Sequence, residues 1–268
     1  MPDPNDTPRT LRMLAWNILH GGSGRRLPHI ALEIVSHEPD LVVISEFRPT
    51  LGGQLLAILA DRGLVHVAEA SGGLTQTRNR IIMVSRFGFE LDTELMREEP
   101  PESLRRRVVV RRLAREAGGL IVTGAHLPDD WIPSSALHGW AWLVDHAIRF
   151  RGDRHVILGD LNGSRDPGQP GGPPRHVAFG MGRLATAGYI DVFAASETEP
   201  SEKSARHTTW KSHWGHELRL DHAIVSGCVS SAIRRAEYMH EPRISGVSDH
   251  SAVLLELSVE LEKTGPEQ

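Results

Sequence analysis

The chain has 268 residues, of which 40% are hydrophobic and 24% are charged, a composition typical of a globular protein with a sizeable core. Its net charge of −4 excludes a protein that is basic throughout, although a local basic patch stays compatible with it. The single cysteine excludes an internal disulfide framework and a cysteine-rich zinc site. Because we find no apolar signal core and no run long enough to span a membrane, we expect a cytoplasmic protein.

The first quarter of the chain alternates between strands and helices. Apolar runs and helical spacing predict a strand, a helix, a strand and a helix at 11–16, 28–37, 40–47 and 51–61. Pro28 suits the first turn of the earlier helix, and Pro39 lies just past its end. The second strand is almost continuously apolar up to Glu46, as expected of a strand that is covered on both faces.

Strands predominate in the rest of the chain. The pattern predicts helices from Ser134 to about Gly152 and at 176–187, with a strand between them that ends at Asp160. Further strands are expected at 65–70, 80–85, 87–94, 106–114, 120–126, 189–193, 207–210, 218–226, 229–239 and 250–260. We therefore expect a single domain with helices packed outside sheets over residues 10–261, and flexible tails at 1–9 and 262–268.

Polar side chains gather where these strands begin or end. Six places share the arrangement, and they contribute Asn17, Glu46, His126, Asp160 with Asn162, Asp221, and Asp249 with His250. Strand ends can collect side chains from distant parts of a chain on a rigid frame. The residues present are carboxylates, amides and imidazoles without thiols, a set that suits Mg²⁺ or Mn²⁺. Because histidines beside such an ion can contact phosphate or move a proton, the set predicts metal-assisted attack of water on a phosphate ester.

Each motif also has a simpler structural explanation when it is taken alone. Asp160 and Asn162 in GDLN could form an Asx turn, and Asn17 or Glu46 could end a strand in solvent. The pair Asp249 and His250 is harder to explain this way, since it places two polar residues directly before a buried strand. The six places together, in this order, have no comparable structural explanation.

That order of motifs resembles the endonuclease/exonuclease/phosphatase superfamily, which includes deoxyribonuclease I, exonuclease III-like enzymes, sphingomyelinases and inositol polyphosphate 5-phosphatases. The resemblance extends from AWNI at 15–18 to SDH at 248–250. It implies an α/β fold, a four-layered α/β sandwich with two central, mostly antiparallel β-sheets flanked by helices.

The resemblance also implies roles for the residues at the metal and the attacking water. Glu46 resembles the direct metal ligand, with Asn17 beside it, and Asp249 resembles the second carboxylate of the metal site. Asp160 resembles the residue that orients or deprotonates the water, and Asn162 its neighbour that contacts the phosphate. The implied cofactor is Mg²⁺ or Mn²⁺.

Two histidines and a carboxylate complete the implied site. His250 resembles the histidine that contacts the scissile phosphate, and Asp221 its orienting partner. His126 resembles a second histidine on the phosphate side. The branch within the superfamily stays open: the TW…RLDH block is similar to exonuclease III-like enzymes, with His222 in place of Tyr, whereas His126 and WNILHG are more similar to deoxyribonuclease I, the deadenylases and the phospholipid and sugar-phosphate enzymes.

The sequence therefore predicts a divalent-metal-dependent phosphodiesterase, a monomeric nuclease that hydrolyses DNA or RNA by in-line attack of an activated water. The alternatives are a phosphatase or phospholipid/sugar-phosphate phosphodiesterase with a small substrate, and a binding module that keeps the fold without activity. Expected substrate contacts are Asn17, Asn79, Arg80 and Trp214. For Asn79 and Arg80 a solvated turn is the competing explanation, and for Trp214 it is apolar anchoring of a loop.

Overall fold

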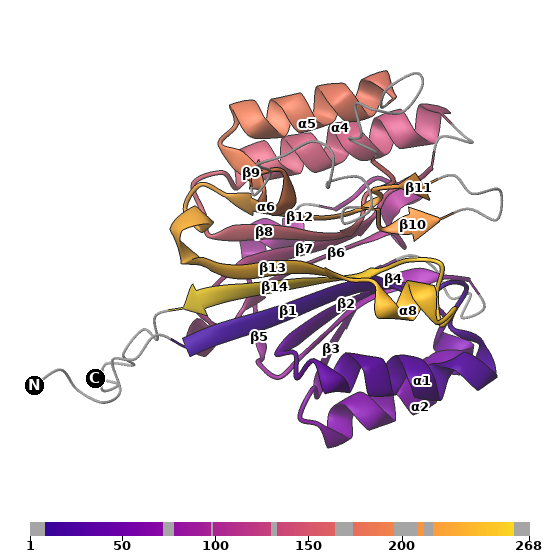
Figure 1. Cartoon of the computed structure of the whole chain (residues 1–268). Helices are drawn as coiled ribbons and strands as arrows, with labels where there is room; N and C mark the ends of the chain where they lie inside the picture. The colour runs from indigo at the N-terminus through magenta and orange to yellow at the C-terminus, as the bar shows by residue number, and fades with distance from the viewer. Residues whose placement is uncertain are drawn as a thin grey trace, which may run out of the picture.

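Two β-sheets lie face to face at the centre of the protein, and helices cover their outer faces (Figure 1). The structure is a computed structural model that describes residues 9–71, 78–97, 99–129, 133–163, 174–195, 208–211 and 217–259. The arrangement confirms the predicted four-layered α/β sandwich. Both predicted tails lie outside the described residues except for Arg9, which begins the first strand.

The first sheet has six strands in the order β13-β14-β1-β2-β4-β3. Their bounds are β1 Arg9–Asn17, β2 Leu41–Phe47, β3 His66–Glu69, β4 Arg80–Ser85, β13 Ile233–Met239 and β14 Ala252–Val259. Only β1 and β2 pair in parallel, and they are joined by the crossover helix α1 (Ser23–Ser36). With α2 (Pro49–Asp61), this helix covers the outer face of the sheet. The sheet brings the two ends of the chain together, since β1 pairs with β14.

The second sheet has six strands in the order β5-β6-β7-β8-β12-β9. Their bounds are β5 Phe89–Glu90, β6 Val108–Leu113, β7 Ile121–His126, β8 His155–Asp160, β9 Tyr189–Asp191 and β12 Asp221–Ser226. Again one pair is parallel: β7 and β8, joined through α4 (Pro133–Arg149). The outer face is covered by α4 and by α5 (Arg175–Thr186). Both sheets are therefore mostly antiparallel, as predicted.

Short elements complete the fold and correct two predicted strands. They are β10 Trp210–Lys211, β11 Glu217–Leu218, α3 Thr93–Arg97, α6 Val192–Ala195, α8 Glu241–Ile244 and 3-10 turns at 102–104, 115–117 and 230–232. The strand expected at 87–94 keeps two residues, because Asp92 Oδ1 accepts the Glu94 N–H and starts α3. Likewise, the strand expected at 189–193 ends at Asp191, whose carboxylate accepts the Phe193 N–H at the start of α6.

Three hydrophobic cores, one between the sheets and one beneath the helices on the outer face of each sheet, explain why the central strands are apolar on both faces. In β2, Val43 packs between the sheets, whereas Val42 and Ile44 pack against the helices. In β8, Leu158 faces the other sheet and Ile157 faces α4 and α5. Among the described residues, no helix has the length and apolar character needed to cross a membrane.

Candidate active site

The register of the strands brings the predicted polar residues to one end of the sandwich. In the first sheet Asn17 pairs with Ser45, which immediately precedes Glu46. In the second sheet Asp160 pairs with His126 on one side and with Asp221 on the other. Parallel strands end at the same sheet edge and β12 begins there, so segments far apart in the sequence deliver these side chains together.

A bulge in β2 turns Glu46 into this site. The register between β2 and β4 shifts after Ile44, and Glu46 has a φ of 59°, a left-handed conformation that costs energy for a residue with a side chain. Its Oε1 accepts the Asn17 amide at 3.3 Å and its Oε2 accepts the Asn79 amide at 3.0 Å. Burial by itself would raise the pKa of Glu46, but nearby His126, the His20 N–H and the Asn17 amide outweigh it and lower the pKa. Glu46 is thus held as a carboxylate.

His20 is a neighbour of this carboxylate for which the sequence suggested no role. Its backbone N–H lies 2.6 Å from Glu46 Oε2, and its Nδ1 lies 2.9 Å from the same oxygen. These contacts depend on an unusual turn, since all five residues from Leu19 to Ser23 have positive φ values between 52° and 76°. Strained turns of this kind are concentrated at functional sites. Because the strain is a backbone property, residue types alone gave no signal for it.

Asp160 lies at the centre of the site and is almost completely buried. Its Oδ2 accepts the Asn17 amide at 2.9 Å and lies 3.5 Å from His126 Nε2 and 3.8 Å from His250 Nε2. Burial raises the pKa of Asp160, which makes its carboxylate a stronger base than one in water. Gly159 allows this placement, because a Cβ there would lie 2.1 Å from the Ala125 carbonyl oxygen of the neighbouring strand.

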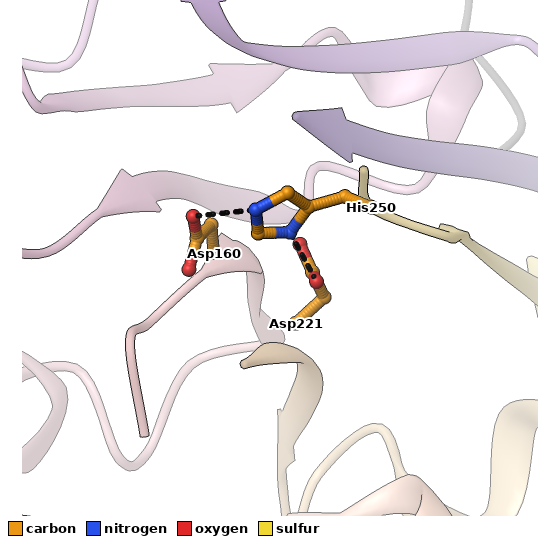
Figure 2. A group of neighbouring side chains, drawn as sticks. All are labelled: Asp160, Asp221 and His250. Carbon is orange, nitrogen blue, oxygen red and sulfur yellow. Dashed lines mark hydrogen bonds and ion pairs between the residues drawn. The ribbon is translucent and has the colours of Figure 1, made fainter. Parts of the chain in front are cut away.

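His250 lies between two carboxylates (Figure 2). Its Nδ1 hydrogen-bonds Asp221 Oδ2 at 2.8 Å, so its Nε2 faces Asp160. Burial opposes a charged imidazole, yet the carboxylates of Asp221 and Asp160 outweigh that effect and raise the pKa of His250 to about 10. A ring held in this way carries a proton near neutral pH and presents it on Nε2 to whatever lies beside Asp160.

Asn162 holds the chain where it leaves β8. Its backbone N–H donates to Asp160 Oδ1 at 3.0 Å, which is the Asx turn that the sequence offered as the simpler explanation. Its side-chain amide donates to the Leu127 carbonyl at 2.7 Å, one residue beyond His126. The structural and the functional explanation of this motif are therefore compatible, because the contacts that close the Asx turn also hold Asp160 and Asn162 beside His126.

Asp249 supplies an oxygen that fits a metal ion. Its Oδ2 accepts the Trp210 indole N–H at 2.9 Å, whereas its Oδ1 is buried, accepts no hydrogen bond within the described part of the chain and lies 3.9 Å from His250 Nε2. Ser248 donates to the Asn17 carbonyl at 2.7 Å, which holds Asp249 next to Asn17. A buried carboxylate oxygen without a hydrogen bond is costly unless a cation lies close to it, and a metal ion can come closer than His250 does. The residues present therefore fit the hard divalent ion expected from the sequence.

Another group of ligand atoms lies nearby. Oxygen and nitrogen atoms of Asp160, Asp221 and His250 lie within 4.8 Å of one another, close enough to share a metal ion. The carboxylate of Asp221 is already engaged by His250 Nδ1, however, so these three are also joined without an ion, by one hydrogen bond and by the ion pair of His250 with Asp160.

Of the predicted substrate contacts, Asn79, Arg80 and Trp214 have still to be placed. Asn79 lies between Glu46 and Arg48, whose guanidinium donates to its Oδ1 at 3.0 Å and 3.2 Å, so Asn79 orients the Glu46 carboxylate. Arg80 pairs with Glu69 on β3 at 2.9 Å. Trp214 lies outside the described residues.

A buried ion pair behind the site was not predicted. Arg219 and Asp191 bind each other, and Arg219 also donates to the Tyr238 hydroxyl at 3.0 Å. His222 contacts the same carboxylate and lies 2.6 Å from the Gly163 carbonyl, next to Asn162. Tyr238 in turn donates to the Asp221 carbonyl at 3.0 Å. The ion pair thus braces two of the segments that carry the site.

The sequence and the fold both have known counterparts. A model of the Endonuclease/Exonuclease/phosphatase family matches residues 14–250. An AP endonuclease from Archaeoglobus fulgidus has 17% identity and a TM-score of 0.71, covering 93% of this chain and 100% of its own. A Neisseria 3′ phosphatase, NExo, bound to a product DNA hairpin, has 20% identity and a TM-score of 0.67, covering 92% and 99%. TDP2 from Caenorhabditis elegans has 17% identity and a TM-score of 0.66, covering 97% and 77%. No curated protein matches the sequence significantly.

Proposed function

Because the chain belongs to the Endonuclease/Exonuclease/phosphatase family, it is a phosphoesterase, and we propose that it hydrolyses phosphodiester bonds of DNA or RNA with the help of a divalent ion. The observation that carries the proposal is the Asn17 amide, which donates to both Glu46 and Asp160 while His250 faces the same Asp160 oxygen. A metal ligand, a base and a proton-bearing ring thereby meet at one point.

Asp160 activates the water in this proposal. Its carboxylate is buried, and its raised pKa makes it a base able to accept a proton from water. The Asn17 amide and the Asn162 N–H each hold one of its oxygens, which fixes the direction in which the carboxylate can accept that proton. Orientation of this kind favours attack in line with the leaving oxygen.

His250 stabilises the negative charge that develops on the phosphate. Asp221 fixes the ring orientation through Nδ1 and keeps the proton on Nε2, where it can donate to a phosphate oxygen. His126, 3.5 Å from Asp160, and Asn162 provide further polar groups on the same side. These donors are in place before the substrate binds, which is what makes such stabilisation effective.

Glu46 and Asp249 would hold Mg²⁺ or Mn²⁺ beside Asn17. The ionised Glu46 and the Oδ1 of Asp249, which accepts no hydrogen bond in the described part of the chain, favour this location over the Asp160, Asp221 and His250 group, in which the Asp221 carboxylate is already hydrogen-bonded. A divalent ion bound there would neutralise charge on the scissile phosphate and its leaving oxygen.

Nucleic acid is the substrate class that the similar structures favour. The NExo structure carries a DNA product, and the Archaeoglobus protein is an AP endonuclease. The alternative is a small phosphate ester, since the protein is acidic overall and His126 is similar to the small-substrate branches of the family.

A substrate panel tests the proposal. We expect cleavage of single- or double-stranded DNA or RNA with Mg²⁺ or Mn²⁺, loss of cleavage with EDTA, and loss of cleavage in Asp160→Asn. Release of inorganic phosphate from small monoesters without nucleic-acid cleavage would support the alternative. Cleavage that EDTA leaves unchanged would contradict the metal site, and absence of all hydrolysis would support the non-catalytic binding module.

A further inference from the structure

A group of arginines lies where β4 and β6 begin, at the end of the sandwich that carries the site. It consists of Arg78, Arg80, Arg106 and Arg107, which we call the arginine edge. The two segments that supply it touch through their backbones, because the Ile81 N–H donates to the Arg106 carbonyl at 2.9 Å and so joins the start of β4 to the residues before β6. The arginine edge therefore spans from the first sheet to the second.

Both ends of the arginine edge reach the active site. The His126 N–H donates to the Arg107 carbonyl at 2.7 Å, and the charge of Arg107 contributes to lowering the pKa of His126, although burial is the larger cause. At the other end Arg78 and Arg80 flank Asn79, whose amide holds Glu46. Positive charge thus lies directly beside residues placed at the metal and at the phosphate.

These arginines have few negative partners. Arg80 pairs with Glu69, but no ion pair or side-chain hydrogen bond of Arg78, Arg106 or Arg107 occurs within the described ranges. Burial, followed by the charges of Arg78, Arg107 and Arg80, lowers the pKa of Arg106, in agreement with guanidinium groups that repel one another. Such repulsion is unfavourable for the protein alone and is relieved when an anion binds.

We propose that the arginine edge binds the phosphate backbone of a polynucleotide on one side of the scissile bond, so that the enzyme distinguishes a strand from a small phosphate ester. The proposal rests on the proposed phosphodiesterase activity and names its substrate class. A small ester extends no further than the metal and His250, whereas a strand places further phosphates outside the site at regular intervals. Guanidinium groups suit this purpose, since they donate forked hydrogen bonds to phosphate oxygens.

Two assays with different substrates separate the two proposals. The first measures kcat/KM for a 20-nucleotide strand, single-stranded or duplex, at increasing salt concentration. The second measures hydrolysis of bis(p-nitrophenyl) phosphate, a small diester. Arg78→Ala/Arg106→Ala is compared with Arg115→Ala, a matched exposed arginine in the turn beyond the far end of β6. Neither arginine of the double variant is part of the catalytic machinery, and thermal unfolding checks that it remains folded.

We expect the double variant to lose affinity for the strand and to reduce the slope of log(kcat/KM) against log[salt] by about 0.7–0.9 per phosphate contact removed. Hydrolysis of the small diester should stay within about twofold of wild type, and Arg115→Ala should match wild type in both assays. Anisotropy of the labelled strand in EDTA should show the same loss of affinity, independently of the metal.

Four outcomes would overturn the inference. An unchanged salt slope, or an equal loss in Arg115→Ala, would show that the arginine edge does not contact the strand. Equal losses for strand and small diester would assign these arginines to the reaction instead. A wild-type enzyme that hydrolyses the small diester but neither binds nor cleaves nucleic acid would contradict both the arginine edge and the nuclease proposal, while leaving the phosphoesterase activity intact.

Discussion

His250 in the proposed active site and His155 between the second sheet and α4 are both buried, and their pKa values shift in opposite directions. His250 faces Asp221 and Asp160, which raise its pKa to about 10 despite burial. For His155, burial, with smaller effects of His146 and Arg112, lowers the pKa well below its ordinary value. Depth alone therefore does not determine the charge of a buried histidine; the neighbouring groups do.

His155 belongs to a buried cluster with His146, Thr123 and Tyr189, which we call the neutral cluster. Its hydroxyl groups hydrogen-bond both histidines in their uncharged form. The Tyr189 hydroxyl donates to the Ala147 carbonyl and so accepts from His155 Nδ1 at 2.7 Å. His155 Nε2 must then accept from the Thr123 hydroxyl at 2.9 Å, and that hydroxyl accepts from His146 Nε2 at 3.0 Å. Each ring carries one proton, and a second proton on His155 Nε2 would break the hydrogen bond that it accepts from Thr123.

The largest expected effect comes from substituting Asp160 or His250, which with Asp221 form the charged counterpart of the neutral cluster. Asp160→Asn and, separately, His250→Gln should each lower kcat by about 10²- to 10⁴-fold, because one loses the base and the other the proton that faces the phosphate. Thr123→Val is the matched control in the neutral cluster and should keep kcat within about twofold. Single-turnover cleavage measures all three, and near-wild-type turnover in either site variant would reject its catalytic role.

The neutral cluster predicts a loss of stability in acid. The pKa of His146 is lowered to about 4 by burial and, to a smaller extent, by Arg149. The unfolded chain therefore takes up a proton below about pH 6.5 that the folded chain refuses until about pH 4, so stability is full above this window and falls as the pH drops through it. The loss from His146 alone should reach about 3 kcal/mol.

Urea unfolding followed by tryptophan fluorescence between pH 7 and pH 4.5 measures this loss. The matched variant is His146→Gln, whose amide can still donate to Thr123 but does not titrate. It should flatten the dependence of unfolding free energy on pH, and carboxylates elsewhere contribute equally to both proteins. An equal slope in variant and wild type would show that His146 has the same pKa in the folded and in the unfolded chain.

Asp221→Asn gives the next largest effect and distinguishes the two possible ligand groups. The amide removes the charge that helps keep His250 protonated, so we expect kcat to fall by about 10- to 100-fold. If Glu46 and Asp249 hold the ion, Mn²⁺ affinity measured by electron paramagnetic resonance should change little in this variant and should fall strongly in Glu46→Gln. A strong loss of Mn²⁺ binding in Asp221→Asn would place the ion in the Asp160, Asp221 and His250 group instead.

The sequence predicted those parts of the fold and site that follow from local patterns. Two-sided apolar runs located β2 and β8, and the residues at their ends are the ones that converge. Asp92 and Asp191 were missed as strand terminators because an Asx contact that starts a short helix depends on one hydrogen bond, which hydrophobic periodicity does not report.

Other parts of the site depend on contacts between distant segments. Arg219 and Asp191 are 28 positions apart and meet only through the pairing of β9 with β12. Asn79 was expected at the substrate, and its hydrogen bond to Glu46, which depends on the bulge in β2, was not foreseen. Such contacts arise from the register of strands, which local sequence patterns do not show.

The smallest expected effect comes from substituting His20. Unlike the buried His250 and His155, its ring is mostly exposed, although it also contacts a carboxylate. Its side chain is 69% exposed, and its backbone N–H and Asn79 also hold Glu46 Oε2. His20→Ala should therefore raise the Mg²⁺ concentration for half-maximal activity by up to about tenfold, the lower end for a group that orients a metal ligand. At saturating metal kcat should be unchanged, as in the exposed control His66→Ala at all concentrations. A fall in kcat that added metal does not restore would mean that His20 contacts the substrate and does more than orient Glu46.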